Sequence, residues 1–206
     1  MIYPERSEGS TVLWRGRVTS AAERAFIAEA QEIPRCARDN VDMKIRPVEP
    51  KDRERIHQIL VAVARFTPDE VKAAVDLVDQ ALDNPEKGEY IVHVLEEPDS
   101  GPKKMVQGYT CYGPTPLTDG VFDLYWIAVD PKRQGQGLGQ LLLRFVENEV
   151  RRQRGRMLLI ETSSKESYGP TLRFYQQSGY AEISRIKDFY RIEDDKVVFS
   201  KMLGQA

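Results

Sequence analysis

Three glycines at alternate positions separate an apolar stretch from a segment with helical periodicity. They are Gly135, Gly137 and Gly139 in the segment RQGQGLGQ. The preceding LYWIAVDP is typical of a buried strand, and the following LLLRFVENEV is typical of a helix. Backbone amides that lead into a helix N-terminus bind phosphate oxygens, and glycine lets a ligand approach the backbone closely. The segment therefore predicts an anion site, with a tight turn that merely needs flexible residues as the alternative.

The spacing of these glycines excludes two common nucleotide-binding motifs. A P-loop requires G-x-x-x-x-G-K-[ST], and no Lys-Ser or Lys-Thr pair follows here. A Rossmann fingerprint requires G-x-G-x-x-G; Gly135 and Gly137 fit, but Gln140 occupies the third glycine position. If the turn binds a phosphate, that phosphate therefore belongs to a molecule that is bound in another way.

Two carboxylates stand inside apolar segments that are expected to form strands. Asp123 lies in VFDLYWIAV and Glu161 in LLIETSS. A carboxylate in such a place is costly unless it is paired. Either the two line an acidic site, or each is paired with a neighbouring Arg or Lys. By period-two alternation, Tyr125 is expected on the same strand face as Asp123 and Ile127.

The composition narrows the class of protein. The chain has 206 residues with a net charge of −2, so no overall basic field favours nucleic acid. It has two cysteines and two histidines, which disfavours a disulfide framework or a metal site and favours a reducing, cytoplasmic location. No apolar stretch is long enough to span a membrane. Whether the protein forms a homodimer is left open.

The elements that must position these residues follow from local patterns. Strands are expected at 44–48, 89–97, 104–113, 121–129 and 156–164, and a final hairpin turns at IEDD. Helices are expected after Pro50, after Thr67 with Pro68 and Glu70 in a capping box, from the glycines to about Gln153, and at 169–179.

The first 42 residues read differently from the rest. They are predicted to be an extension with one short helix over 19–33, and residues 43–206 are predicted to be the main domain. The helix either docks or dimerises, or it is peripheral.

Two motifs carry a resemblance to a known family. V-D-P-x-x-Q-G-x-G-L-G-x-x-L-L resembles the acetyl-CoA motif [QR]-x-x-G-x-[GA] of the GNAT superfamily of N-acetyltransferases. RFYQQSGY, residues 173–180, resembles the family's F-Y-x-x-x-G-[FY] segment. The resemblance spans about 43–203 and implies an α/β (α+β) GNAT fold. In that fold a mixed, mostly antiparallel sheet of about seven strands splays between the fourth and fifth, flanked by about four helices.

The resemblance also implies which residues bind the cosubstrate. The coenzyme A pyrophosphate would lie on the amides from Gln134 to Gly139, and the pantetheine arm beside the end of strand 121–129, where it splays from strand 156–164. The residues so predicted to bind coenzyme A are Ile127, Ala128, Val129, Gln134, Gly135, Gln136, Gly137, Leu138, Gly139 and Gln140.

The resemblance also implies catalytic roles. Tyr175 stands where the family commonly places the general acid, with an ordinary buried tyrosine as the alternative, and Asp123 matches in offset the glutamate base of related histone acetyltransferases. Glu161 is the other candidate base, on the ground of its place in an apolar strand rather than of the resemblance. Cys111 lacks an obvious base nearby and is expected to be a buried structural residue. The predicted function is acetyl transfer from acetyl-CoA to a small or amino-acid-like primary amine, without a metal. The alternatives are a protein acetyltransferase and a non-catalytic acyl-CoA-binding module.

Overall fold

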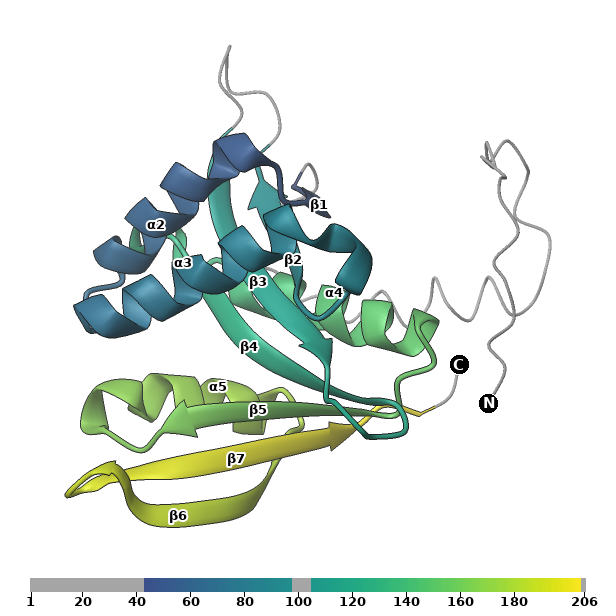
Figure 1. The fold of residues 1–206 in the computed structure, drawn as a ribbon. Coiled ribbons are helices and arrows are strands. Elements are labelled where there is room, and N and C mark those ends of the chain that lie inside the picture. The colour runs from purple at the N-terminus through teal and green to yellow at the C-terminus, as the bar shows by residue number, and fades with distance from the viewer. Residues whose placement is uncertain (1–42, 98–104, 205–206) are drawn as a thin grey trace. The chain divides into compact units, whose positions relative to one another are not determined.

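The structure, a computed structural model, describes residues 43–97 and 105–204. The predicted helix at 19–33 and the proposed boundary after residue 42 lie outside this part or at its edge. In the described part, strands and α-helices follow the order β1-α2-α3-β2-β3-β4-α4-β5-α5-β6-β7 (Figure 1). This is the order that the sequence patterns predict.

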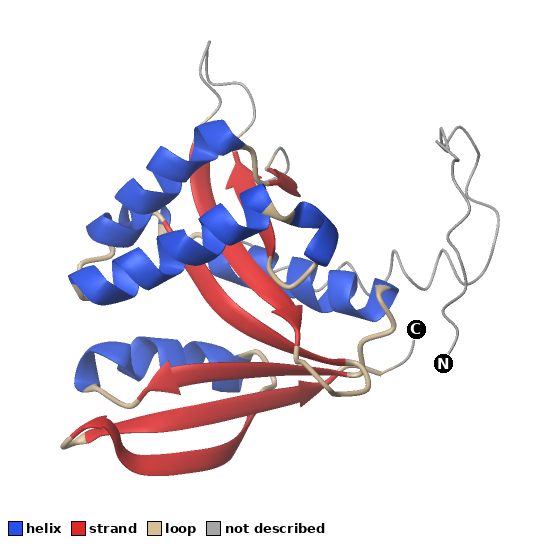
Figure 2. Ribbon diagram, in the orientation of Figure 1, coloured by secondary structure: helices blue, strands red, loops and turns tan. Residues whose placement is uncertain are grey.

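The strands form one mixed sheet, which confirms the predicted α/β fold class (Figure 2). Its strand order is β1-β2-β3-β4-β5-β7-β6, and every neighbouring pair is antiparallel except β4 and β5. The strands are β1 Lys44–Pro47, β2 Ile91–Glu96, β3 Val106–Pro114, β4 Val121–Val129, β5 Met157–Ser163, β6 Ala181–Arg191 and β7 Asp194–Met202.

The helices begin where the sequence signals place them. Thr67 caps α3 by accepting a hydrogen bond from the Glu70 amide at 3.2 Å, and the Glu70 carboxylate accepts from the Thr67 amide at 2.7 Å. The segment after Pro50 starts as a short 3-10 turn before α2 begins at Arg53. The helices are α2 Arg53–Ala62, α3 Pro68–Asp83, α4 Leu138–Arg152 and α5 Gly169–Gln177.

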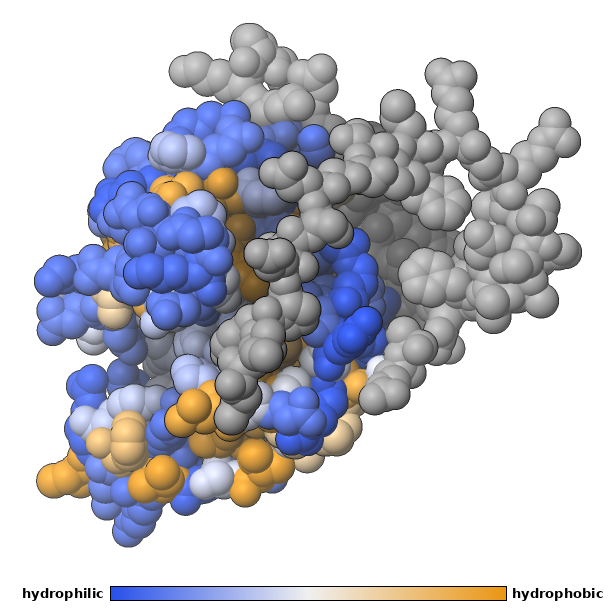
Figure 3. Space-filling view, turned by 45° about the vertical axis from the view of Figure 1, so that its right-hand side comes forward, coloured by the Kyte–Doolittle hydropathy of each residue, from blue (hydrophilic) through white to orange (hydrophobic). Residues whose placement is uncertain are grey.

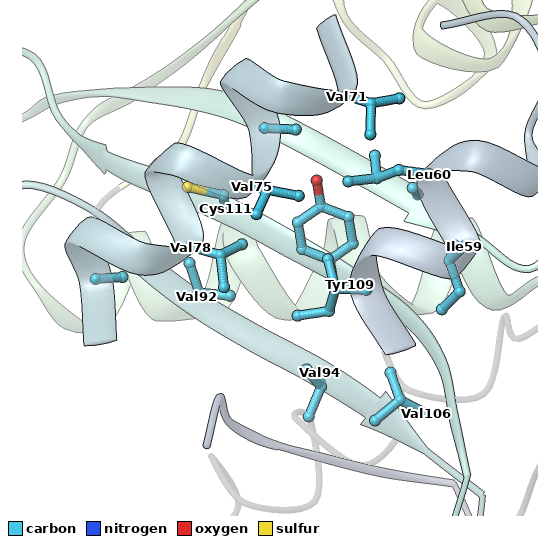
Figure 4. Packing of buried hydrophobic residues seen from close by; sticks show 14 residues of the cluster. Ile59, Leu60, Val71, Val75, Val78, Val92, Val94, Val106, Tyr109 and Cys111 are labelled. Atoms are coloured by element: carbon cyan, nitrogen blue, oxygen red, sulfur yellow. The ribbon is translucent and has the colours of Figure 1, made fainter. Parts of the chain in front are cut away.

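In the described part of the chain, three hydrophobic clusters cover the two faces of the sheet, the smallest of them between α4 and the ends of β2 and β4. The first joins α2 and α3 to β2, β3 and β4, with Tyr109 of β3 pointing toward the two helices (Figure 4). The second joins α4 and α5 to β4, β5 and β7. A buried side chain of β4 can therefore be assigned to the α2–α3 face or the α4–α5 face by the cluster it joins.

The parallel pair β4–β5 holds together over only part of its length. Val121 to Leu124 pair with Met157 to Ile160, and beyond these residues the two strands diverge, as Figure 1 shows. This is the predicted splay. It leaves Ile127, Ala128 and Val129 paired to β3 on one side and without a strand partner on the β5 side, within the described residues.

A β-bulge in β4 corrects one expectation. Cys111 pairs with Trp126 and Tyr112 pairs with Leu124, so Tyr125 is an extra residue with no partner in the register. The extra residue reverses the alternation of faces beyond it. Tyr125 packs on the α2–α3 core, on the same face as Asp123, as predicted. Ile127 packs on the α4 side. The period-two prediction that Ile127 shares this face is wrong.

The last hairpin turns more tightly than IEDD predicts. Strand β7 begins at Asp194, so only Ile192 and Glu193 lie between the strands. Asp194 is 1% exposed and accepts a hydrogen bond from Ser163 Oγ at 2.5 Å. This buried bond to β5 draws the aspartate into the strand, although aspartates favour turns by local propensity.

Candidate active site

The glycine segment forms the turn that leads into α4. Gly135 has φ +75° and Gly137 has φ +80°, a left-handed region that favours glycine. Gly137 is the N-cap of α4, so it has no side chain to cap the helix, and the first turn carries no acidic residue. The amides at this helix end therefore keep both their hydrogen-bonding capacity and the positive end of the helix dipole.

Side chains around the turn hold it in place. Arg133 Nε donates to Gln136 Oε1 at 2.9 Å, and Gln134 Nε2 donates to the Val129 carbonyl at 3.3 Å. Ser178 Oγ donates to Gln140 Oε1 at 3.0 Å, and Leu138 is 1% exposed. The turn is thus joined to the end of β4 and to the residue that follows α5. A Cβ added at Gly135 would meet no atom within 4 Å, so its backbone is open to a ligand.

Tyr175 lies on α5 in the core of the α4–α5 face. It is 5% exposed, and its ring packs against those of Phe174, Tyr180 and Phe199, with centroid distances of 5.3, 6.1 and 5.9 Å. Burial raises the pKa of the Tyr175 phenol well above its ordinary value of 10. The phenol therefore carries its proton at neutral pH.

Asp123 lies on the other face of the sheet. Thr115 Oγ1 donates a hydrogen bond to Asp123 Oδ2 at 2.6 Å. Burial raises the pKa of the Asp123 carboxyl above its ordinary value, and the nearby charge of Glu161 raises it further. A carboxylate whose pKa is raised is a stronger base than an exposed aspartate.

Glu161 shares the α2–α3 side of the sheet with Asp123. Asp123 is in register with Leu159, and Glu161 is two residues further along β5. Its side chain is half exposed and forms an ion pair with Lys196 Nζ at 2.6 Å. Lys196 in turn lies 5.0 Å from the ring centroid of Phe189. The structure brings Asp123 and Glu161 together electrostatically, but it leaves Glu161 charge-paired and Asp123 without a cation in direct contact among the described residues.

The hairpin of β6 and β7 exposes a row of apolar side chains beside this pair. Strand β6 is exposed along its whole length. Apolar colour is prominent in the lower part of Figure 3, where this hairpin lies. Its large exposed apolar residues are Ile183, Ile186, Phe189, Tyr190 and Ile192.

Two residues of the site have no signal in the linear sequence. Thr115 and Lys196 meet Asp123 and Glu161 only because the register of β3 with β4, and of β5 with β7, brings them close. Cys111 is fully buried, and burial raises the pKa of its thiol to about 12, so it is no nucleophile at neutral pH.

Comparisons with known proteins bear on this geometry. Residues 88–182 match the family model described as Acetyltransferase (GNAT) domain. A solved structure of a GNAT-family protein from Desulfovibrio desulfuricans is 39% identical, with a TM-score of 0.74 over 79% of this chain and 99% of that one. A comparison with curated protein sequences gives no match.

Two more distant structures share the fold. The ribosomal-protein-S18-alanine N-acetyltransferase from Escherichia coli is 18% identical, with a TM-score of 0.62 over 80% of this chain and 96% of that one. YncA from Salmonella typhimurium, solved with acetyl-CoA, is 20% identical, with a TM-score of 0.60 over the same shares of 80% and 96%. The matched domain and the 39% identity over nearly the whole of a GNAT-family structure establish the relationship: this chain belongs to the GNAT family of acetyltransferases.

Proposed function

We propose that the protein transfers the acetyl group of acetyl-CoA directly to a primary amine. The observation that carries this proposal is the open turn at Gly135 and Gly137, which leads into an uncapped helix beside a split strand pair. The related fold of YncA, solved with acetyl-CoA, supports the choice of cosubstrate.

The residues around the turn fit coenzyme A. The amides of the segment from Gln134 to Gln140 would hold the pyrophosphate, because they combine hydrogen-bond donors with the positive end of the α4 dipole. Ile127 and Val129 would bind the pantetheine amides through backbone groups that face away from β3. The backbone groups of Ala128 face β3 instead, because Asp130, two residues on, donates its amide to the Gln107 carbonyl. The Val129 carbonyl accepts from Gln134 Nε2, so the ligand would have to share or displace that bond. When bound, acetyl-CoA supplies an activated acyl group as a thioester.

Asp123 is the proposed general base. An alkylamine has an ordinary pKa near 10.4 and must lose a proton to attack a carbonyl carbon. Asp123 accepts this proton before the C–N bond forms, aided by its raised pKa, and so frees the nitrogen lone pair for attack on the thioester carbon. Glu161 is the weaker candidate because its carboxylate is engaged in an ion pair with Lys196.

Tyr175 is the proposed general acid. As the C–S bond breaks, the leaving thiolate needs a proton, and the Tyr175 phenol carries one across the neutral pH range. The acid packs with the α4–α5 face and the base lies on the α2–α3 face, so the sheet lies between them, and the gap between β4 and β5 opens just beyond Asp123, after Leu124. A substrate that passes through this gap would meet both groups.

The proposed acceptor is a small or amino-acid-like primary amine. The test measures thiol release from acetyl-CoA with a panel of phenethylamine, spermidine, L-lysine, L-phenylalanine and short peptides with a free N-terminus or a lysine. Turnover of at least one small amine, with no thiol release in its absence, is the expected result. Turnover of peptides alone would show a protein acetyltransferase. Tight coenzyme A binding without turnover of any amine or peptide would show a non-catalytic binding module.

A further inference from the structure

We propose that Thr115 is a positioning residue that holds the Asp123 carboxylate in place for proton abstraction. The inference rests on the proposed function, in which Asp123 is the base. It starts from the hydrogen bond of 2.6 Å from Thr115 Oγ1 to Asp123 Oδ2. Thr115 itself contacts the base and is not expected to contact the reacting atoms.

The backbone of Thr115 is fixed on both sides. Its amide donates to the Val121 carbonyl at 2.9 Å, which closes the hairpin between β3 and β4. Its own carbonyl accepts a hydrogen bond from Thr118 Oγ1 at 2.7 Å. These two bonds hold the Thr115 backbone at the end of the sheet, so its hydroxyl is in a fixed position and can define the orientation of the Asp123 carboxylate.

The strand register explains why Thr115 serves Asp123. Gly113 lies directly opposite Asp123 and has no side chain to offer. A Cβ at Gly113 would lie 1.9 Å from the Glu89 carbonyl oxygen, so a side chain cannot be accommodated there. Thr115 is the next residue of the chain on that face, two positions on, and it reaches the carboxylate diagonally. Its hydroxyl thus replaces the contact that the opposite position cannot make.

The hydrogen bond makes the two carboxylate oxygens of Asp123 different from each other. Oδ2 accepts from Thr115, while Oδ1 accepts no hydrogen bond from any described residue. We therefore assign the proton of the amine to Oδ1, the oxygen that no described residue contacts by a hydrogen bond.

The same bond also acts on the ionisation of Asp123. Burial and the charge of Glu161 on β5 raise the pKa of Asp123, whereas the Thr115 hydrogen bond and Lys196 on β7 lower it. Among the described residues, Tyr125 on β4 is the remaining titratable group in electrostatic contact with Asp123, and it is neutral at working pH because burial raises its pKa to about 12. Loss of the Thr115 hydroxyl should thus leave Asp123 with a higher pKa.

The experiment compares the wild type with Thr115→Val, Thr115→Ala and Thr115→Ser. The carboxyl pKa of Asp123 is followed by NMR titration of the free full-length protein labelled with 13C-aspartate, and Asp123→Asn identifies the signal. The pH dependence of kcat/KM is then measured with acetyl-CoA and the most active amine of the panel. Thr110→Val is the matched control, because the Thr110 hydroxyl is buried without a partner and lies on β3 opposite Ile127, on the other face.

Thr115→Val and Thr115→Ala are expected to raise the Asp123 pKa and to move the acidic limb of the rate profile to higher pH by the same amount. Thr115→Ser and Thr110→Val should leave both values near wild type. An unchanged Asp123 pKa in a folded Thr115→Val or Thr115→Ala variant would overturn the role of Thr115. If the pKa of Asp123 rises while the rate profile stays fixed, the hydrogen bond stands but Asp123 is not the base, and that part of the proposed function fails.

Discussion

At the scale of single residues, the proposed base and the proposed acid lie in surroundings that change the pKa of each. Burial raises the pKa of both Asp123 and Tyr175. For the aspartate this makes a better base, provided that it remains ionised, and for the tyrosine it preserves the acidic proton.

Tyr175→Phe isolates the acid role, because it removes one oxygen and keeps the ring in its aromatic cluster. We expect kcat to fall by about 100-fold or more, the usual range for losing a general acid. The affinity for coenzyme A, measured by calorimetry, should stay within a factor of about two, since no other contact changes. An unchanged kcat across the pH range would remove Tyr175 from the mechanism.

Single residues are also where the sequence is least informative. Asp123 and Tyr175 stand out by their motif and surroundings, but Thr115 and Lys196 contact the carboxylates across strands. The bulge at Tyr125 inserts one residue without any local signal, and so it moves Ile127 to the opposite face. Such contacts depend on strand register, which is fixed by the packing of the whole sheet.

At the scale of elements, the turn into α4 combines one glycine that its backbone requires with one that it does not. Gly137 has a φ of +80°, whereas Gly139 lies within α4 and its added Cβ would meet Phe174 at an ordinary 3.7 Å. The two positions therefore respond differently to the same methyl group.

Gly137→Ala should lower the free energy of unfolding by about 1–2 kcal/mol, the cost of a left-handed conformation for a residue with a Cβ. Gly139→Ala should leave it unchanged or raise it by up to about 1 kcal/mol, because alanine is the better helix former. Urea denaturation measures both. Equal losses in the two variants would show that the turn does not have this backbone geometry.

Element order and helix starts were predictable because their signals are local. The capping box at Thr67 and the glycines before α4 each act within one turn of backbone. The start of β7 in the last hairpin was not predictable from local signals. The buried hydrogen bond between Asp194 and Ser163 on β5 outweighs the turn preference of aspartate.

At the scale of the whole molecule, one half-buried histidine links folding to pH. His93 on β2 packs against Phe145 of α4 at 4.7 Å and against Tyr112 of β3 at 5.9 Å. Burial, with a smaller contribution from Arg152, lowers its pKa from 6.5 to about 4.

Within the described residues, no helix is long and apolar enough to cross a bilayer.

Because the folded pKa of His93 is depressed, its neutral form is present in both states above pH 6.5. Between pH 6.5 and about 4 the unfolded chain binds a proton that the folded chain does not, so stability falls as pH falls. The slope from this residue is at most about 1.4 kcal/mol per pH unit, reduced by the partial exposure of the ring.

His93→Gln should flatten the pH dependence of the free energy of unfolding over this window, measured by urea denaturation. His57→Gln, at the other histidine of the chain, is the control and should keep the wild-type slope. If both variants keep it, His93 titrates normally and is not held neutral by the fold.

The central claim is that Asp123 accepts the amine proton during acetyl transfer from acetyl-CoA. The most direct measurement is the pH dependence of kcat/KM for the wild type, Asp123→Asn and Glu161→Gln, read by thiol release with the most active amine of the panel. The predicted result is that Asp123→Asn loses most of the activity and the acidic limb, while Glu161→Gln keeps the limb. An acidic limb that persists in Asp123→Asn and disappears in Glu161→Gln would contradict the claim and assign the base to Glu161.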